Sequence, residues 1–360
     1  MNTHKSFKSF LTLILAPFIF TLSACGSDSN STENNSNNST KPVSRNTATI
    51  VKTRGQLVCG VSGELPGFSF VGTDGNYSGI DVDVCRAVAA AVFDDPNAVE
   101  FRNLNSKERF TALQTGEVDL LSRNTSWTLS RDTSVGLDFA PVVFYDGQGM
   151  MVNKNSGIKS LKDLQGKAIC TQTGTTTEQN LADQMRKRNI TYKSVVFEDV
   201  NVTFATYAEG RCEGITADRS ALVSRRTTLP KPDDHIILDE LLSSEPLAPA
   251  VAKGDPQWRD TVKWTVYALI KAEELGINSQ NIAQFANSND PEIKRFLGTE
   301  GNLGEGLGLS NDFAARIVKH VGNYGEIYDR NLGKQTQLNL PRNQNQLSTN
   351  GGLLYSPPFR

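Results

Sequence analysis

The order of apolar segments and amphipathic helices constrains this chain most, because the same alternation runs through it twice. Residues 56–61 are predicted to form a strand, residues 80–92 place apolar side chains at helical spacing, and residues 99–104 predict a second strand. The alternation starts again at residue 147 and reaches a further strand at residues 215–218. Strands that alternate with helices in this way form a parallel sheet covered by helices. The sequence therefore predicts an α/β fold built from two such units in series.

The chain that follows residue 245 must pack against these two units. It predicts a strand over residues 248–252 and long helices over residues 258–275 and 311–329. The segment from residue 331 is rich in Asn, Gln, Gly and Pro, and it ends on the apolar and aromatic residues 353–359. We expect this aromatic terminus to be docked on the body of the protein rather than loose.

Composition and charge exclude several classes of function. The 360 residues include 37 lysines and arginines and 39 aspartates and glutamates, which give a net charge of −2. This balance offers no electrostatic reason to expect a nucleic acid as a partner. The three histidines, His4, His235 and His320, lie far apart in the sequence, so no metal site is expected. No apolar run reaches the length of about 18 residues that a membrane-spanning helix needs.

The N-terminus has the pattern of an export signal. Two lysines precede the apolar residues 10–22, and Leu-Ser-Ala stands directly before Cys25. This arrangement resembles a bacterial lipobox, in which Cys25 would become the lipidated first residue after removal of residues 1–24. The alternative is an ordinary signal peptide with an incidental cysteine. Residues 25–50 are rich in Ser, Thr and Asn and predict a flexible linker, so we expect a periplasmic, membrane-anchored lipoprotein.

Four cysteines remain after Cys25, and an even number in an exported chain predicts two disulfides. Three connectivities are possible. We favour Cys59–Cys85 and Cys170–Cys212, because each pair closes a loop of moderate length within one region of the chain. The alternative is four separately buried thiols.

The first candidate site segment is residues 123–132, which follow a predicted strand. Hydroxyl and amide side chains stand where a short helix would begin, so its backbone N–H groups are free to bind an anion. Arg131, one turn later, can add a bidentate hold on a carboxylate. The alternative for Arg131 is a surface ion pair with Asp132 or Asp138.

Two further candidates lie in the second unit. Thr175 follows Gly174 at the start of a helix, and this loop lacks the lysine of a nucleotide-binding P-loop. Asp218 stands at the carboxyl end of a strand, where α/β sheets bind ligands. Each residue has an alternative role as a helix cap. Together with Arg131, they would complement a zwitterion such as a free amino acid.

At this point the chain resembles a known family, the extracytoplasmic solute-binding proteins of ABC transporters. The resemblance is to the family 3 type and its general L-amino-acid branch, which takes glutamate, glutamine, aspartate and asparagine. It covers nearly everything from residue 55 to the end. The segments that carry it are 65–69 (LPGFS), 79–91 (GIDVDVCRAVAAA), 123–132 (RNTSWTLSRD), 145–149 (YDGQG), 174–178 (GTTTE), 245–247 (EPL) and 350–355 (NGGLLY).

The resemblance implies a two-lobed periplasmic-binding-protein type II fold, with a ligand cleft between lobes that two crossover strands join. Lobe 1 would comprise residues 51–147 and 246–360, and lobe 2 residues 148–245. Arg131 would bind the α-carboxylate of the ligand, and Asp218 its α-ammonium. Asn124, Ser126 and Thr175 would complete the pocket.

One departure from the family pattern concerns side-chain specificity. Many relatives place an acid and an aromatic residue after the first strand, whereas here Glu64 is followed by Leu65. Glu64 is therefore a candidate whose orientation the sequence leaves open. Arg123 and Trp127 either recognise an acidic or amide side chain or lie on the lobe surface.

The function expected from these observations is capture of polar, acidic and neutral L-amino acids by lobe closure, without catalysis or a cofactor. The partners would be the free amino acids and the permease of an ABC transporter with its ATPase, and the protein would act as a monomer. A periplasmic dehydratase on the same fold would need a general acid and base in the cleft, and no histidine falls in the cleft segments. A ligand-sensing protein is the remaining alternative.

Overall fold

The computed structural model describes residues 45–360, so the predicted signal peptide, Cys25 and most of the predicted linker lie outside the described residues. The first element is helix α1 (Thr47–Arg54), capped by the side chain of Asn46. The backbone N–H of Thr47 donates to Asp255 at 2.7 Å. The linker expected over residues 25–50 is therefore helical in its last four residues, because local capping and this long-range bond order them.

The first sheet has five strands in the order β5-β1-β6-β14-β7. Strand β1 is parallel to both β5 and β6, whereas β14 is antiparallel to β6 and β7. The parallel arrangement expected for this unit therefore holds for β5, β1 and β6, whereas β14 runs antiparallel to its two neighbours. The strands are β1 (Leu57–Val61), β5 (Val99–Asn103), β6 (Leu120–Leu121), β7 (Leu137–Phe139) and β14 (Ala250–Ala252).

Helices α2 (Ile80–Phe93), α3 (Arg109–Thr115) and α8 (Pro256–Glu274) pack on this sheet. Helix α2 is buried along nearly all of its length, including the carboxylates Asp81 and Asp83 in its first turn. Acidic side chains at a helix N-terminus are favoured by the helix dipole. Asp81 also lies beneath the loop that follows β6, which becomes important for the site.

The second sheet has the order β10-β9-β11-β8-β12, with β13 paired to the other part of β8. Strands β10, β9 and β11 are parallel, and β8 is antiparallel to β11 and β12. The strands are β8 (Phe144–Asn153), β9 (Ala168–Gln172), β10 (Lys193–Phe197), β11 (Gly214–Asp218), β12 (His235–Ile237) and β13 (Ser244–Leu247). The accompanying helices are α5 (Thr176–Lys187), α6 (Val200–Ala208) and α7 (Arg219–Arg226).

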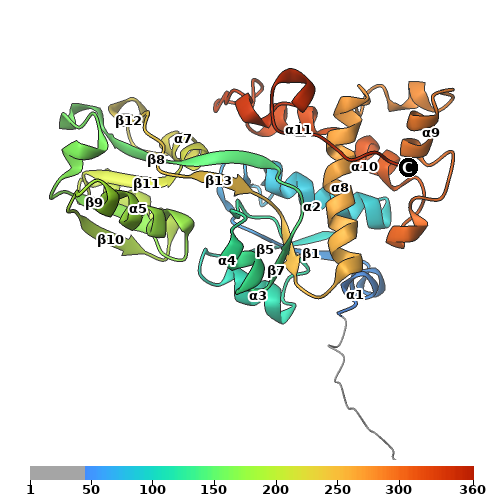
Figure 1. Cartoon of the computed structure of the whole chain (residues 1–360), viewed down its shortest axis with the longest axis horizontal. Helices are drawn as coiled ribbons and strands as arrows, with labels where there is room; N and C mark the ends of the chain where they lie inside the picture. The colour runs from blue at the N-terminus through green and yellow to red at the C-terminus, as the bar shows by residue number, and fades with distance from the viewer. Residues whose placement is uncertain (1–44) are drawn as a thin grey trace, which may run out of the picture. The chain divides into compact units, whose positions relative to one another are not determined.

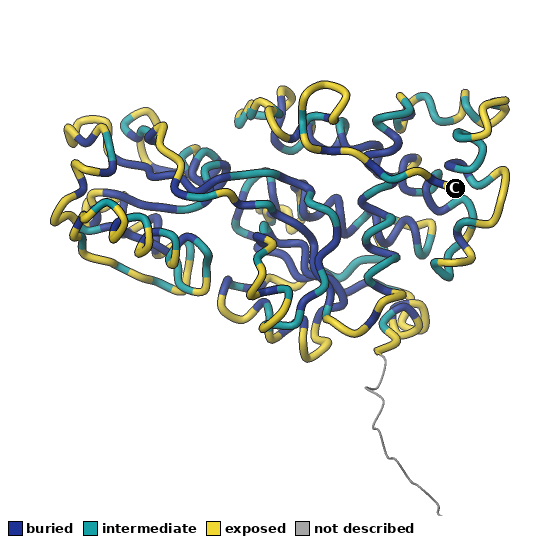
Figure 2. The backbone as a smooth tube through the Cα atoms, in the orientation of Figure 1, coloured by how far each residue is buried: buried dark blue, intermediate teal, exposed yellow. Residues whose placement is uncertain are grey.

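Strands β8 and β13 connect the two sheets, running antiparallel side by side (Figure 1). At one end Phe144 of β8 packs in the core of the first lobe, against Phe68 and Tyr328. At the other end β8 pairs with β11 in the second sheet. The chain thus passes once out of the first lobe and once back, which gives the two-lobed fold with two crossover strands that the family resemblance implied. The inner strands of both sheets are largely buried, whereas the edge strands β5 and β10 contain only partly buried and exposed residues (Figure 2).

One predicted element is wrong. The helix expected over residues 311–329 is two helices, α10 (Phe313–Val321) and α11 (Tyr324–Asn331). Gly322 separates them with a φ of 87°, and Asn323 starts α11 through a capping box with Glu326. Glycine adopts this backbone angle without strain, so Gly322 ends the first helix, and the capping box at Asn323 begins the second.

Several short elements carried too little periodicity to be predicted. They are a three-stranded sheet of β2 (Glu64–Leu65), β3 (Ser69–Val71) and β4 (Tyr77–Ser78), and the helix α9 (Pro291–Leu297). The short helix expected to begin within residues 123–132 is present as α4 (Leu129–Thr133). Single 3₁₀ turns cover Lys154–Ser156, Leu161–Leu164, Pro232–Asp234, Ile282–Phe285, Glu305–Leu307, Asn343–Asn345 and Ser348–Asn350. No helix in residues 45–360 combines the length and apolar character needed to cross a bilayer.

The C-terminus is docked, as predicted. Phe359 is only 3% exposed. Its ring packs against Trp264 of α8, Phe296 of α9 and Phe313 of α10. The aromatic C-terminal residues therefore belong to the same hydrophobic core as Ala48 and Val51 of α1.

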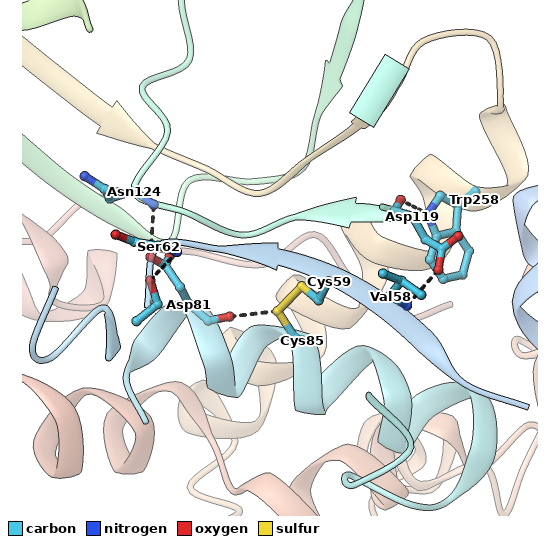
Figure 3. Close-up of a disulfide and its surroundings, with 9 residues drawn as sticks. Val58, Cys59, Ser62, Asp81, Cys85, Asp119, Asn124 and Trp258 are labelled. Carbon is cyan, nitrogen blue, oxygen red and sulfur yellow. Dashed lines mark hydrogen bonds between the residues drawn. A yellow bond between two sulfur atoms is a disulfide. The ribbon is translucent and has the colours of Figure 1, made fainter. Parts of the chain in front are cut away.

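Both predicted disulfides are present. Cys59–Cys85 joins β1 to α2 (Figure 3), and Cys170–Cys212 joins β9 to the turn before β11. Each bridge stays within one lobe, so neither opposes a movement of the lobes relative to each other.

Replacing Cys170 and Cys212 together by Ser should lower the free energy of unfolding by about 4 kcal/mol, because the bridge restricts the unfolded chain across its loop. The two cysteines are 42 residues apart in sequence, against 26 for Cys59 and Cys85. Removal of Cys59–Cys85 should therefore lower the free energy of unfolding slightly less. Urea unfolding followed by circular dichroism measures both effects. A decrease in the free energy of unfolding below about 1 kcal/mol on removal of Cys170–Cys212 would contradict the loop-entropy account.

Candidate functional site

A cavity lies where the loops that follow β1 and β6 in the first lobe meet helices α5, α6 and α7 and the end of β11 in the second. Side chains from both lobes line it, and most of them are polar. They are Ser62, Glu64, Leu65, Arg109, Arg123, Asn124, Ser126 and Arg131 from the first lobe, and Gln172, Thr175, Thr176, Thr177, Val200, Thr203, Phe204, Thr216, Ala217, Asp218, Ala221 and Arg225 from the second.

The loop after β6 is held in an unusual conformation at Asn124, whose φ is 30°. Its backbone N–H donates to the carboxylate of Asp81 at 2.9 Å, at the start of α2 (Figure 3). The side-chain Oδ1 of Asn124 is buried and has no hydrogen-bond donor in the described part of the chain. A buried acceptor without a partner is costly, so this atom is available to a ligand.

Arg131 is buried beside the cavity and is 7% exposed. Its Nη1 donates to the carbonyl of Ser126 at 2.8 Å, and its guanidinium lies 5.1 Å from the ring centroid of Phe110. Asp132 instead accepts from Trp127 and from Lys253. The alternative of a surface ion pair for Arg131 is therefore wrong. Burial lowers the pKa of Arg131, opposed by nearby carboxylates.

Ser126 belongs to a hydrogen-bond network that spans the two lobes around Glu245 of β13. The hydroxyl of Ser126 donates to Glu245, and Thr176 Oγ1 donates to the same carboxylate at 2.9 Å. Asn180 Nδ2 of α5 donates to its other oxygen at 2.8 Å. Glu245 thus ties the candidate anion-binding loop of one lobe to the helix start of the other.

Thr175 caps α5 and also lines the cavity, so its role as a cap is confirmed and its role in ligand binding stays a prediction. Its hydroxyl accepts from the N–H of Glu178 at 3.2 Å and donates to the carbonyl of Gln172 at 2.6 Å. The start of this helix adds the positive end of a helix dipole to the cavity wall.

Asp218 ends β11 and is 7% exposed. Its side chain makes no capping bond to α7, so the capping alternative is wrong. Burial raises its pKa well above the usual range, and the nearby Asp146 and Glu245 raise it further, while Arg109 and Arg131 oppose them. A buried carboxylate of this kind gains most from a cationic partner that also brings hydrogen bonds.

Glu64 and Arg123 both line the cavity. Arg123 Nε donates to the carbonyl of Leu104 at 2.8 Å, and burial lowers its pKa to about 10. Glu64 is half-buried and accepts from Asn201 of α6 at 2.9 Å. Burial and the neighbouring Asp199 raise its pKa, against the opposing effect of nearby arginines.

Trp127 does not reach the cavity and is 41% exposed. Its indole N–H donates to Asp132 at 3.0 Å, and its ring stacks on Phe139. Of the two roles weighed for Trp127, the structure supports the one on the lobe surface. The backbone N–H of Trp127 donates to the carbonyl of Pro246 at 2.8 Å.

Sequence reasoning missed two arginines of the cavity, Arg109 in α3 and Arg225 in α7. Arg109 is buried and donates to Thr125 at 3.3 Å. Arg225 donates to the carbonyl of Glu64 at 2.9 Å and to Asn201 at 2.7 Å. An arginine within a helix is usually on its solvent face, so the only available signal was their nearness in sequence to predicted site loops.

The charged residues that line the cavity are four arginines and two acids, Glu64 and Asp218. This excess of cations favours a ligand with more anionic than cationic groups. No group of His, Cys, Asp and Glu within the described residues is arranged to hold a metal ion.

A family model described as bacterial extracellular solute-binding proteins, family 3, matches residues 57–281. The chain belongs to this family. The resemblance inferred from the sequence is therefore confirmed.

Among its relatives is the general L-amino acid-binding periplasmic protein AapJ of Rhizobium johnstonii. It is 53% identical over 320 residues, which are 88% of this chain and 94% of AapJ. The glutamate/glutamine/aspartate/asparagine-binding protein BztA of Rhodobacter capsulatus is 50% identical over 319 residues, or 88% and 94% of the two chains. These relatives extend beyond the family model into the C-terminal helices.

A solved structure of a related periplasmic binding protein from Brucella ovis, with glutathione bound, has a TM-score of 0.86 to this chain. It is 50% identical and covers 88% of this solute-binding protein and 100% of its own chain. The similarity supports the two-lobed type II fold.

The carboxyl of Asp81 should make stability depend on pH. Burial raises its pKa from 3.8 to about 6, against the N–H of Asn124 and nearby arginines. The folded protein therefore holds a proton that the unfolded chain loses, and this contribution, complete below pH 3.8, is lost as the pH rises through about 6.

In Asp81→Asn the free energy of unfolding should therefore fall less between pH 4 and 7 than in the wild type, by up to about 3 kcal/mol. Denaturant titrations across this range measure the difference. The exposed substitution Asp95→Asn is the control, and identical pH profiles for Asp81→Asn and the wild type would refute the assignment.

Proposed function

We propose that this protein is the substrate-binding component of an ABC-type uptake system for L-amino acids. The observation that carries the proposal is the placement of the buried Arg131 and the buried Asp218 on opposite lobes of one cavity. Arg131 would bind the α-carboxylate, and Asp218 the α-ammonium. Asn124, Ser126 and Thr175 would supply the remaining hydrogen bonds.

Lobe closure follows from the charges of such a ligand. A zwitterion that leaves water must find partners for both of its charged groups, or the loss of hydration outweighs the gain. Arg131 comes from the first lobe and Asp218 from the second, so only the closed arrangement satisfies both. The ligand then acts as a further contact between the lobes and shifts the population towards closure.

The relatives and the charge of the cavity support the range of ligands that we propose. General L-amino acids, and glutamate, glutamine, aspartate and asparagine, are what the names of two relatives state. The four arginines favour ligands that carry a second anionic or polar end. Glutathione, bound by the Brucella ovis protein, combines the same α-amino acid group with further carboxylate and amide groups.

We also propose that the protein works in the periplasm, as a monomer anchored to a membrane through lipidated Cys25. It would deliver its ligand to a permease with an attached ATPase. The lobes correspond to residues 51–147 with 246–360, and 148–245. We propose no catalytic step, since the relatives are solute-binding proteins and no histidine lines the cavity.

A thermal-shift panel of the purified protein against the twenty amino acids, sugars, polyamines and carbocyclic acids tests the function. A ligand at a hundred times its dissociation constant adds about 2.7 kcal/mol of stability, which raises the melting midpoint. Several L-amino acids should produce this shift. A response only to a carbocyclic acid would contradict the proposal and favour a dehydratase.

Arg131→Ala should weaken binding of every responding amino acid by several kcal/mol, because the α-carboxylate loses a buried charged partner. Isothermal titration calorimetry measures the loss. The exposed Arg102→Ala, which removes a surface pair with Glu100, is the matched control and should bind normally. Unchanged affinity in Arg131→Ala would remove this residue from the site.

Asp218→Asn should weaken L-glutamate about a hundredfold or more, because the ammonium loses its buried carboxylate. Glutarate, which lacks the ammonium, should lose much less. Competition titrations with both ligands measure the ratio, with Asp95→Asn as the control variant. An equal loss for both ligands would mean that Asp218 does not hold the ammonium.

A further inference from the structure

The cavity has two electrostatically distinct ends. Apart from burial, the pKa of Asp218 is governed by Asp146, Glu245, Arg109 and Arg131. The pKa of Arg225 is governed instead by Glu64 and Asp199. Of the four arginines that line the cavity, Arg123 is the one whose pKa responds to acids at both ends, Asp218 and Glu64. If one end holds the α-amino acid group, the other must face the end of the ligand's side chain.

The side-chain end is built from both lobes. Glu64 comes from β2 of the first lobe, whereas Arg225 and Asn201 come from α7 and α6 of the second. Arg225 donates to the backbone carbonyl of Glu64, and Asn201 donates to its carboxylate. Their bonds cross the cleft, so this end is complete only when the lobes are closed.

This end offers both donors and acceptors. Arg225 Nε is buried without an acceptor within the described part of the chain. Glu64 can accept hydrogen bonds when it is ionised, and can donate one when it is protonated. The guanidinium of Arg225 lies 5.0 Å from the ring centroid of Phe204, which fixes its plane.

The charges around Glu64 come from three directions. Asp199 precedes α6, Arg225 lies in α7, and Arg123 follows β6. Asn201 supplies a neutral hydrogen bond. A second carboxylate that enters from a ligand would face Glu64 directly, and two close carboxylates favour sharing one proton.

We propose that Glu64 and Arg225 together read the end of the ligand's side chain, and that a side-chain carboxylate is bound with uptake of one proton by Glu64, whereas a carboxamide is bound without it. With an amide ligand, ionised Glu64 accepts from the amide NH₂ and Arg225 donates to the amide oxygen. With an acidic ligand, Arg225 donates to the ligand carboxylate, and protonated Glu64 donates a second bond. One pocket thus admits both end groups.

This inference rests on the proposed function, because it presupposes that an amino acid occupies the cavity. It adds a property that amino-acid binding alone does not require. The affinity for L-glutamate relative to that for L-glutamine should fall, up to tenfold per pH unit, as the pH rises from the pKa of Glu64 in the glutamine complex to its higher pKa in the glutamate complex. Below and above this interval the ratio should be constant.

The test is calorimetric titration of the purified protein with L-glutamate and L-glutamine at pH 6, in two buffers of different ionisation enthalpy. The number of protons taken up should be higher by about one for L-glutamate. Any proton that Asp218 releases to the solvent when the ammonium binds is common to both ligands, so it cancels in the difference. Glu64→Gln should abolish the difference, and Glu100→Gln, an exposed site in β5, should retain it.

Equal proton uptake for the two ligands in the wild type would overturn the inference, as would a difference that survives in Glu64→Gln. If that variant does not fold, the ratio of the wild-type affinities between pH 5 and 9 decides alone, and a constant ratio refutes the inference. Failure to bind either amino acid would overturn the proposed function itself. The two failures are therefore distinguishable.

Discussion

The antiparallel pairing of β8 with β13 is the constraint on which the rest of the structure depends. These strands carry the chain out of the first lobe and back, so their register decides which residues of the two lobes face each other. In that register Glu245 stands opposite Asp146. Both carboxylates are satisfied by groups from elsewhere: Ser126 and Thr176 donate to Glu245, and Ser220 donates to Asp146. The paired strands β8 and β13 and the cavity therefore share one hydrogen-bond network.

Buried charge is the second organising feature. Arginines and carboxylates are brought together in a water-poor cavity, where each is costly alone and valuable when paired. Backbone carbonyls accept some of the hydrogen bonds that the buried arginines donate, from Arg131 to Ser126 and from Arg123 to Leu104. Arg109, Asn124 and Arg225 line the cavity, and each has a buried polar side-chain atom without a hydrogen-bond partner in the described residues, which a zwitterionic ligand would supply. A cavity of this kind selects by charge pattern before it selects by shape.

Much of the fold was predictable, because strand and helix periodicity are local. The strand ending at Asp218 was inferred correctly for this reason. Both disulfides were inferred correctly because each pair closes a loop of moderate length within one region of the chain. The helix break at Gly322 was not, because an apolar periodic pattern continues across it. Arg109 and Arg225 were missed because their role arises only when separate helices meet at the cleft. Trp127 was weighed for a ligand role because it lies in the right segment, but its side chain packs on Phe139 instead.

The docking of Phe359 also bears on the order in which the molecule can assemble. The first lobe contains both the start of the described chain and its last aromatic residue, whereas the second sheet and its helices form one continuous stretch. When the chain is made or exported from its N-terminus onward, the second lobe can therefore fold completely while the first lobe still lacks α8, α10 and the ring of Phe359. The residues proposed to bind opposite ends of a ligand would then come from two lobes, of which the second folds first and the first finishes folding last.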